Sequence, residues 1–207
     1  MYIKKYNSLF IHIPRTGGTS VERTFGYQGG FDTYDETRGM NQDHRSAKEV
    51  YPLLQEQWDD MFKFTIVRNP WEKMVSMYLY KLNSPFYASQ PNEWENRFKR
   101  ETGEFPDFKR WLTNMEWATN KVRVMGCFDQ LNYITLDGKI CVDFIAEFST
   151  LSKDWDKIKE QMQCIEDLPH LNKSKKNYDY RTFYDSETDK TIRQRFAKDI
   201  EYFGYKL

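Results

Sequence analysis

Residues 9–20 read LFIHIPRTGGTS, and the fold of the chain is interpreted outward from this stretch. Its apolar start predicts a buried strand over residues 7–13. A proline, an arginine, two glycines and two hydroxyl residues follow, and residues 18–26 then have the composition of a short helix. Thr19 and Glu22 have the spacing of a capping box. The stretch therefore predicts a strand, a turn with much backbone freedom, and a capped helix.

A second stretch, residues 61–82, repeats the order of strand, turn and helix. MFKFTIV at 61–67 is short, apolar and β-branched, as buried strands are. Asn69 is suited to cap a helix and Pro70 to its first position. The residues that then recur at helical spacing, and predict one buried face, are Trp71, Met74, Val75, Tyr78, Leu79 and Leu82.

These two units set the fold class. Strands followed by turns and helices favour an α/β fold with a central parallel sheet flanked by helices, and we expect residues 1–207 to form a single domain. Ligands bind such sheets beyond the carboxyl ends of the strands, so both turns should lie at one edge. Elsewhere, a helical stretch opens at His44. Residues 27–43 and 83–104 are expected as loops, 105–115 and 151–165 as helices, 139–148 as strand and 186–203 as a closing helix.

The composition excludes several classes of protein. There are 31 basic and 31 acidic residues, so no net field draws the chain to nucleic acid or to an anionic membrane. No apolar run reaches the roughly 18 residues of a membrane span, and the first residues do not resemble a signal peptide. A cytoplasmic protein is expected. Three scattered cysteines and three histidines lack the spacing of a zinc site, so no metal is expected.

The turn after the first strand has the parts of an anion site. Glycines let successive backbone N–H groups face one concavity, and a helix N-terminus adds partial positive charge. Arg15 adds a fork of donors, and hydroxyls follow at Thr19 and Ser20. A nucleoside-triphosphatase loop would place a lysine directly before its hydroxyl residue, whereas Gly18 precedes Thr19 here. The turn therefore favours binding of a tetrahedral anion, with a simple turn before a helix as the alternative.

Arg68, at the end of the second strand, and Ser76, eight residues later, could hold a second anion. Taken alone, an arginine paired with a carboxylate and a solvated serine would explain them equally well.

Together the two motifs, PRTGGTS and VRNPWEKMVSMY, resemble the nucleotide site of sulfotransferases that use 3′-phosphoadenosine-5′-phosphosulfate (PAPS), and among them the carbohydrate sulfotransferases. The resemblance implies a phosphate-binding-loop-like fold and a metal-free site. It implies that Arg15, Thr16, Gly17, Gly18, Thr19 and Ser20 hold the 5′-phosphosulfate. It also implies that Arg68 and Ser76 hold the 3′-phosphate, and that a loop with Lys173 and Ser174 closes over the nucleotide. Many relatives have lysine where this chain has Arg15, which can stabilise charge but hardly donate a proton.

Sulfuryl transfer to an alcohol needs a base for the hydroxyl proton, and histidine is suited to that task. In the resembled enzymes a histidine between the two nucleotide motifs is the base, so His44 is the candidate. His12 is expected to be packed or hydrogen-bonded near the first strand, and His170 could touch substrate or brace the late loop. Glu22 and Asp43 are weaker candidates, and Glu22 is expected to cap its helix.

The resemblance favours a carbohydrate acceptor, for which residues 83–104 offer aromatic rings and cations; a small alcohol, a lipid or a peptide tyrosine stays open. Two alternative functions also stay open. One is a kinase of the related fold, which would need magnesium and a loop lysine. The other is a binding module that keeps the nucleotide pocket without turnover.

Overall fold

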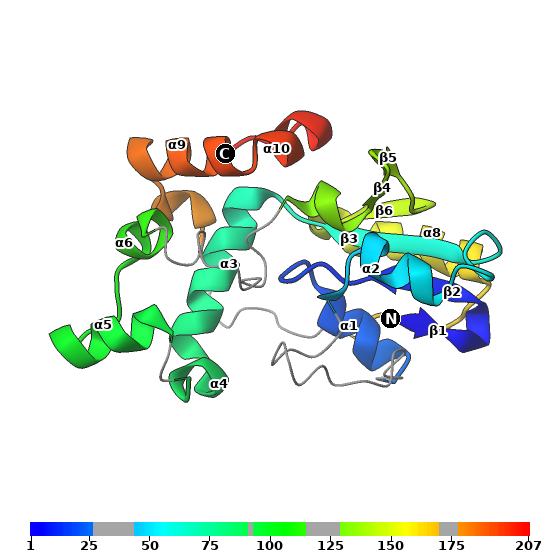
Figure 1. The fold of residues 1–207 in the computed structure, drawn as a ribbon, viewed down its shortest axis with the longest axis horizontal. Helices are drawn as coiled ribbons and strands as arrows, with labels where there is room; N and C mark the ends of the chain where they lie inside the picture. The colour runs from blue at the N-terminus through cyan, green and yellow to red at the C-terminus, as the bar shows by residue number, and fades with distance from the viewer. Residues whose placement is uncertain (27–43, 91–92, 115–128, 170–177) are drawn as a thin grey trace. The chain divides into compact units, whose positions relative to one another are not determined.

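A computed structural model describes residues 1–26, 44–90, 93–114, 129–169 and 178–207 (Figure 1). The chain divides into two compact units, each built from two separate segments. Unit 1 comprises Met1–Arg68 with Phe128–Asn177, and unit 2 comprises Asn69–Cys127 with Tyr178–Leu207. That the whole chain acts as one domain stays a prediction.

Unit 1 is built on a four-stranded sheet in the order β1 (Tyr2–Ile3), β2 (Ser8–Ile11), β3 (Phe62–Val67) and β6 (Phe144–Glu147). In Figure 1, β3 lies between β2 and β6, and these three strands run parallel while β1 pairs antiparallel at the edge. Two short strands, β4 (Thr135–Leu136) and β5 (Lys139–Ile140), form a separate hairpin. The prediction of an α/β fold with parallel strands and flanking helices is confirmed.

Helices α1 (Gly18–Thr24) and α8 (Leu151–Met162) cover one face of this sheet. Side chains alternate along a strand, so Phe10 on β2 and both Phe64 and Ile66 on β3 point to this face. Trp155 and Ile158 of α8 pack against them, and all of these residues except Trp155 are fully buried. The core of unit 1 therefore fixes where α1 begins.

Short helical turns complete unit 1. They are η1 (Lys4–Tyr6), α2 (Ala47–Val50), η3 (Tyr51–Leu53), η4 (Gln130–Tyr133) and η5 (Phe148–Thr150). The helical stretch expected from His44 begins three residues later, because Ser46 and Glu49 form a capping box that starts α2 at Ala47.

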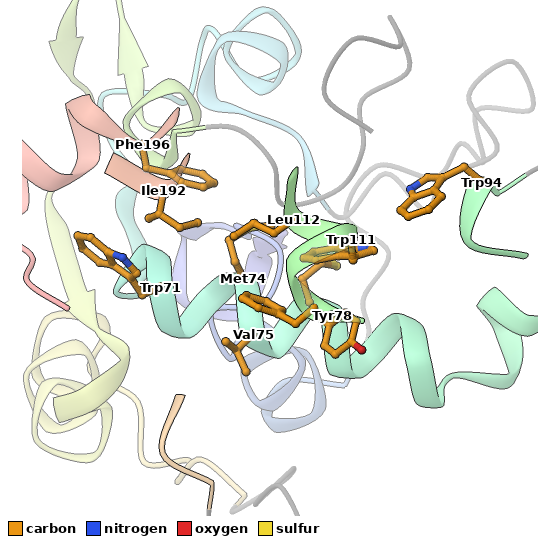
Figure 2. Packing of buried hydrophobic residues seen from close by; sticks show 11 residues of the cluster. Trp71, Met74, Val75, Tyr78, Trp94, Trp111, Leu112, Ile192 and Phe196 are labelled. Carbon is orange, nitrogen blue, oxygen red and sulfur yellow. The ribbon is translucent and has the colours of Figure 1, made fainter. Parts of the chain in front are cut away.

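Unit 2 is helical in the residues that the structure describes. Its long helix is α3 (Pro70–Asn83), followed by α4 (Pro85–Ala88), α5 (Trp94–Thr102), α6 (Phe108–Thr113), η6 (Tyr180–Phe183), α9 (Ser186–Arg195) and α10 (Ala197–Phe203). Figure 2 shows the core, in which Trp71, Met74, Val75 and Tyr78 of α3 face Leu112 of α6 and Ile192 of α9. The Asn69 side chain accepts the Trp71 N–H at 3.0 Å, so the predicted cap and the Pro70 start are confirmed.

Three expectations for unit 2 are wrong. Leu82 is 43% exposed because it lies in the last turn of α3, beyond the buried cluster. The expected loop at 83–104 contains α4 and α5, since Trp94 finds a buried place in the core. The single closing helix is two helices that meet at Phe196, whose backbone leaves the helical region while its ring is fully buried.

A buried charge cluster ties α5 to α3 within unit 2. Lys81 donates to Glu93 and to Glu95, each at 2.8 Å, and Glu95 also accepts the Trp111 indole N–H at 2.8 Å. Burial by itself lowers the pKa of Lys81, but the two carboxylates outweigh it and raise that pKa above its ordinary value. The ammonium is therefore held in its charged form.

Removing the ammonium leaves Glu95 buried without its counter-charge. Lys81→Met should lower the free energy of unfolding by about 3 kcal/mol, measured by urea denaturation. The double variant Lys81→Met/Glu95→Gln should recover most of that loss, since glutamine can still accept from Trp111. A single variant as stable as the wild type would show that the pair contributes nothing.

Candidate functional site

The three parallel strands of unit 1 end at one edge of the sheet, where the next residues are His12, Arg68 and Phe148. The Arg68 guanidinium carbon lies 4.0 Å from the centre of the Phe148 ring, an attractive cation–π arrangement. Its Nη1 donates to the backbone oxygen of Arg15 at 3.0 Å. Arg68 thus ties the ends of β3 and β6 to the loop that follows β2.

The backbone of Arg68 is fixed by Gln130. The Arg68 N–H donates to Gln130 Oε1 at 2.8 Å, and Gln130 Nε2 donates back to the Arg68 carbonyl at 2.9 Å. Gln130 is fully buried and Arg68 is 8% exposed. Sequence reasoning missed Gln130, because a partner 62 residues away leaves no local pattern.

The loop between β2 and α1 uses left-handed backbone. Arg15 has φ +67° and Gly17 has φ +97°. Backbone of this kind turns successive N–H groups toward one side, as in the concavities that bind anions. The Thr16 hydroxyl donates to the Ile13 carbonyl at 2.8 Å and the residue is fully buried, so its side chain holds the loop in shape.

Gly17 and Gly18 are required by space as well as by conformation. A Cβ at Gly17 would lie 3.1 Å from the Phe148 ring. At Gly18 it would overlap the His12 imidazole. The backbone at the start of α1 is therefore bare against two rings, and any side chain added there would push the loop away from them.

The predicted capping box between Thr19 and Glu22 is wrong. Gly17 is the N-cap of α1, and no side chain caps this helix. Glu22 lies one turn after Gly18 on the same face of α1, and its Oε1 is 2.6 Å from His12 Nδ1. The contact is short, although the ring N–H does not point along a regular hydrogen bond. The carboxylate turns to the buried ring instead of to its own helix end.

His12 is a neutral imidazole. Burial, the N-terminal ammonium and Arg15 together lower its pKa to about 3. Burial raises the pKa of Glu22, which positive charge on His44 and on the N-terminus lowers. His12 stacks on Phe10 with ring centres 5.4 Å apart. The prediction of a packed histidine next to the first strand is confirmed.

His44 lies against His12. The centres of the two rings are 4.2 Å apart at an angle of 63°, and His44 Nδ1 is 3.2 Å from the His12 carbonyl oxygen. The residue is partly exposed. The proposed base and the loop of the first motif are thus neighbours within unit 1, as the sequence led us to expect.

The remaining predicted site residues are in different positions. Thr19 is exposed, and Ser20 is largely buried with its N–H donating to the Gly17 carbonyl at 3.0 Å. Ser76 is 7% exposed on α3 and belongs to unit 2. Lys173 and Ser174 lie outside the described residues.

Unit 2 has an open pocket of about 470 Å³ beside α5 and α6. Its lining combines two aromatic rings, two arginines, an acid and two small polar side chains. These residues are Trp94, Arg97, Phe98, Glu101, Arg110, Thr113 and Asn114. Aromatic faces with nearby cations suit a ligand that has both apolar and anionic parts.

Among the described residues, no three histidine, cysteine or acidic side chains come together as metal ligands would. In the same residues no helix has the length and apolar character needed to cross a membrane.

The comparisons with known proteins agree with this architecture. No curated protein and no solved structure matches the chain. A family model described as the sulfotransferase family matches residues 1–206. That match spans both units and includes the loop after β2, Arg68 and His44. The chain belongs to the sulfotransferase family.

Proposed function

We propose that this protein transfers the sulfuryl group of PAPS to a hydroxyl of a carbohydrate-type acceptor. Membership of the family supports sulfuryl transfer in general. The observation that carries the choice of donor is the bare, left-handed loop between β2 and α1, braced by Arg68. A side chain on Gly17 or Gly18 would push this loop out of shape, and the loop has the backbone of an anion cradle.

The residues of the loop divide the work of holding the phosphosulfate. Backbone N–H groups from Thr16 to Gly18 supply donors, and Thr19 and Ser20 supply hydroxyls. Arg15 supplies a permanent positive charge, which stabilises negative charge that develops on the departing phosphate oxygen. PAPS itself supplies an activated sulfuryl group with a bisphosphate leaving group.

The 3′-phosphate is assigned to Arg68 with Ser76, and closure over the nucleotide to Lys173 and Ser174. For Arg68 the support is its place at the carboxyl edge and its fixed backbone. One of its five N–H donors goes to the Arg15 carbonyl, so the same side chain braces the loop and offers charge at its end.

His44 is the proposed general base, and the acceptor hydroxyl gives it a proton as the new bond to sulfur forms. Its support is its position on His12, directly after β2 and before the loop. For the acceptor we propose a sugar, bound in part by the pocket of unit 2, where Trp94 and Phe98 can stack and Arg97 can meet an acidic group. We place this reaction in the cytoplasm.

The donor assignment is tested by calorimetry with adenosine 3′,5′-bisphosphate in the absence of magnesium, with 5′-AMP and ATP as comparisons. We expect the bisphosphate to bind more tightly than 5′-AMP by at least about 100-fold, which corresponds to roughly 2.7 kcal/mol for the 3′-phosphate. Arg68→Ala should remove most of this difference. Binding of ATP that equals or exceeds that of the bisphosphate would contradict the sulfotransferase assignment and favour a kinase.

The loop is tested by Gly18→Ala. Its methyl group would overlap the His12 ring, so α1 and the loop must shift. We expect binding of the bisphosphate to weaken by at least about tenfold, or 1.4 kcal/mol. Gly103→Ala is the matched control, because its methyl group meets nothing within 4 Å. If Gly18→Ala binds the bisphosphate as the wild type does, the loop is not the donor site.

The base is tested by His44→Ala. The turnover number should fall by about 10²–10⁴-fold, while the dissociation constant of the bisphosphate stays unchanged. Sulfate transfer from ³⁵S-labelled PAPS to a panel of glycans measures the first quantity, and calorimetry the second. Donor binding by the wild type without transfer to any glycan, and no effect of the substitution, would instead indicate a binding module.

A further inference from the structure

Glu22, His12 and His44 form one chain of contacts in unit 1. Glu22 Oε1 lies 2.6 Å from His12 Nδ1, and the His12 ring lies 4.2 Å from the His44 ring, centre to centre. Gly18 and Glu22 are four residues apart on α1, so the helix meets His12 with a bare backbone in one turn and a carboxylate in the next. Binding of PAPS does not by itself require this carboxylate.

The backbone of His12 fixes which nitrogen of His44 carries the proton. A carbonyl oxygen can only accept a hydrogen bond, so the 3.2 Å contact to the His12 oxygen requires the proton on His44 Nδ1. In a neutral imidazole the lone pair is then on Nε2. A histidine held in this tautomer can accept a proton at one atom only.

We propose that His12 and Glu22 are positioning residues for His44: the His12 carbonyl holds the Nδ1–H tautomer, and the Glu22 carboxylate favours the imidazolium that forms during transfer. The inference rests on the proposed function, in which His44 is the base. The acceptor O–H bond breaks and its proton goes to Nε2, the acceptor oxygen bonds to sulfur, and the electron pair of the broken S–O bond stays on the phosphate oxygen.

The charges around the cluster agree with this assignment. Positive charge on His44 lowers the pKa of Glu22, and by reciprocity a Glu22 carboxylate favours protonated His44. The N-terminal ammonium acts on both Glu22 and His12, and Arg15 acts on His12. These cations keep the buried His12 neutral, so the negative charge of Glu22 is not cancelled by the ring beside it.

The test compares Glu22→Gln with Glu22→Asp and with Glu160→Gln, a matched loss of charge at an exposed site on α8. Activity rises with pH as a basic His44 loses its proton. Without the carboxylate, the acid limb of the pH profile for turnover should move down by about half a unit, and turnover at neutral pH should fall roughly tenfold. Glu22→Asp should keep the acid limb near its wild-type position, and Glu160→Gln should match the wild type throughout.

A lower turnover without movement of the acid limb would overturn the role of Glu22, because a merely structural defect changes amplitude alone. Far-UV circular dichroism and the binding of adenosine 3′,5′-bisphosphate show whether each variant is folded. Active wild-type enzyme with an unmoved acid limb in Glu22→Gln would leave the proposed function standing and remove only this inference.

The tautomer is measured without any turnover. The chain has three histidines, so ¹⁵N spectra of the imidazoles are simple to assign with His44→Ala. We expect the Nδ1–H form for neutral His44 and a lower titration midpoint in Glu22→Gln. An Nε2–H form, or a midpoint that ignores Glu22, would overturn the inference even if the protein transferred no sulfate at all.

Discussion

The contact between the His12 ring and the backbone of Gly18 constrains the whole carboxyl edge of unit 1. His12 directly follows β2, and Gly18 begins α1, so the chain must turn back on itself within the five residues between them. The turn needs left-handed backbone, which Gly17 adopts readily and Arg15 adopts at a cost on the order of 1–3 kcal/mol. Strain of this size at a loop end is typical of functional sites, and here it turns N–H groups toward one side.

The same contact explains why a carboxylate enters the interior. With Gly18 pressed on the ring, the next turn of α1 brings Glu22 to the other side of the imidazole. A buried carboxylate is costly unless it is paired, and the imidazole edge and nearby positive charge offset that cost. Placement of Glu22 is thus a consequence of how closely α1 approaches β2, and the catalytic proposal makes use of it.

Sequence reasoning succeeded where the signal is local. The strands at 61–67 and near 7–13, the Asn69–Pro70 helix start and the amphipathic α8 follow from patterns within a few residues. It failed where tertiary contacts decide. Thr19 and Glu22 have the spacing of a capping box, but the carboxylate gains more from His12 than from its own helix end. Gln130 and the cluster at Lys81 depend on partners in distant segments, which a period or a spacing cannot encode.

Arginine in place of lysine at position 15 gives this arrangement its chemical logic. A guanidinium stays charged near neutral pH, so the loop can stabilise a departing phosphate oxygen but cannot give it a proton. An activated bisphosphate is a good enough leaving group to depart as an anion when fixed charge awaits it. The proton of the acceptor is then the only one that must move, and its destination decides the rate. A base whose tautomer is held by a backbone carbonyl, and whose cationic form is favoured by a buried carboxylate, meets that demand with groups that one helix and one strand end bring together.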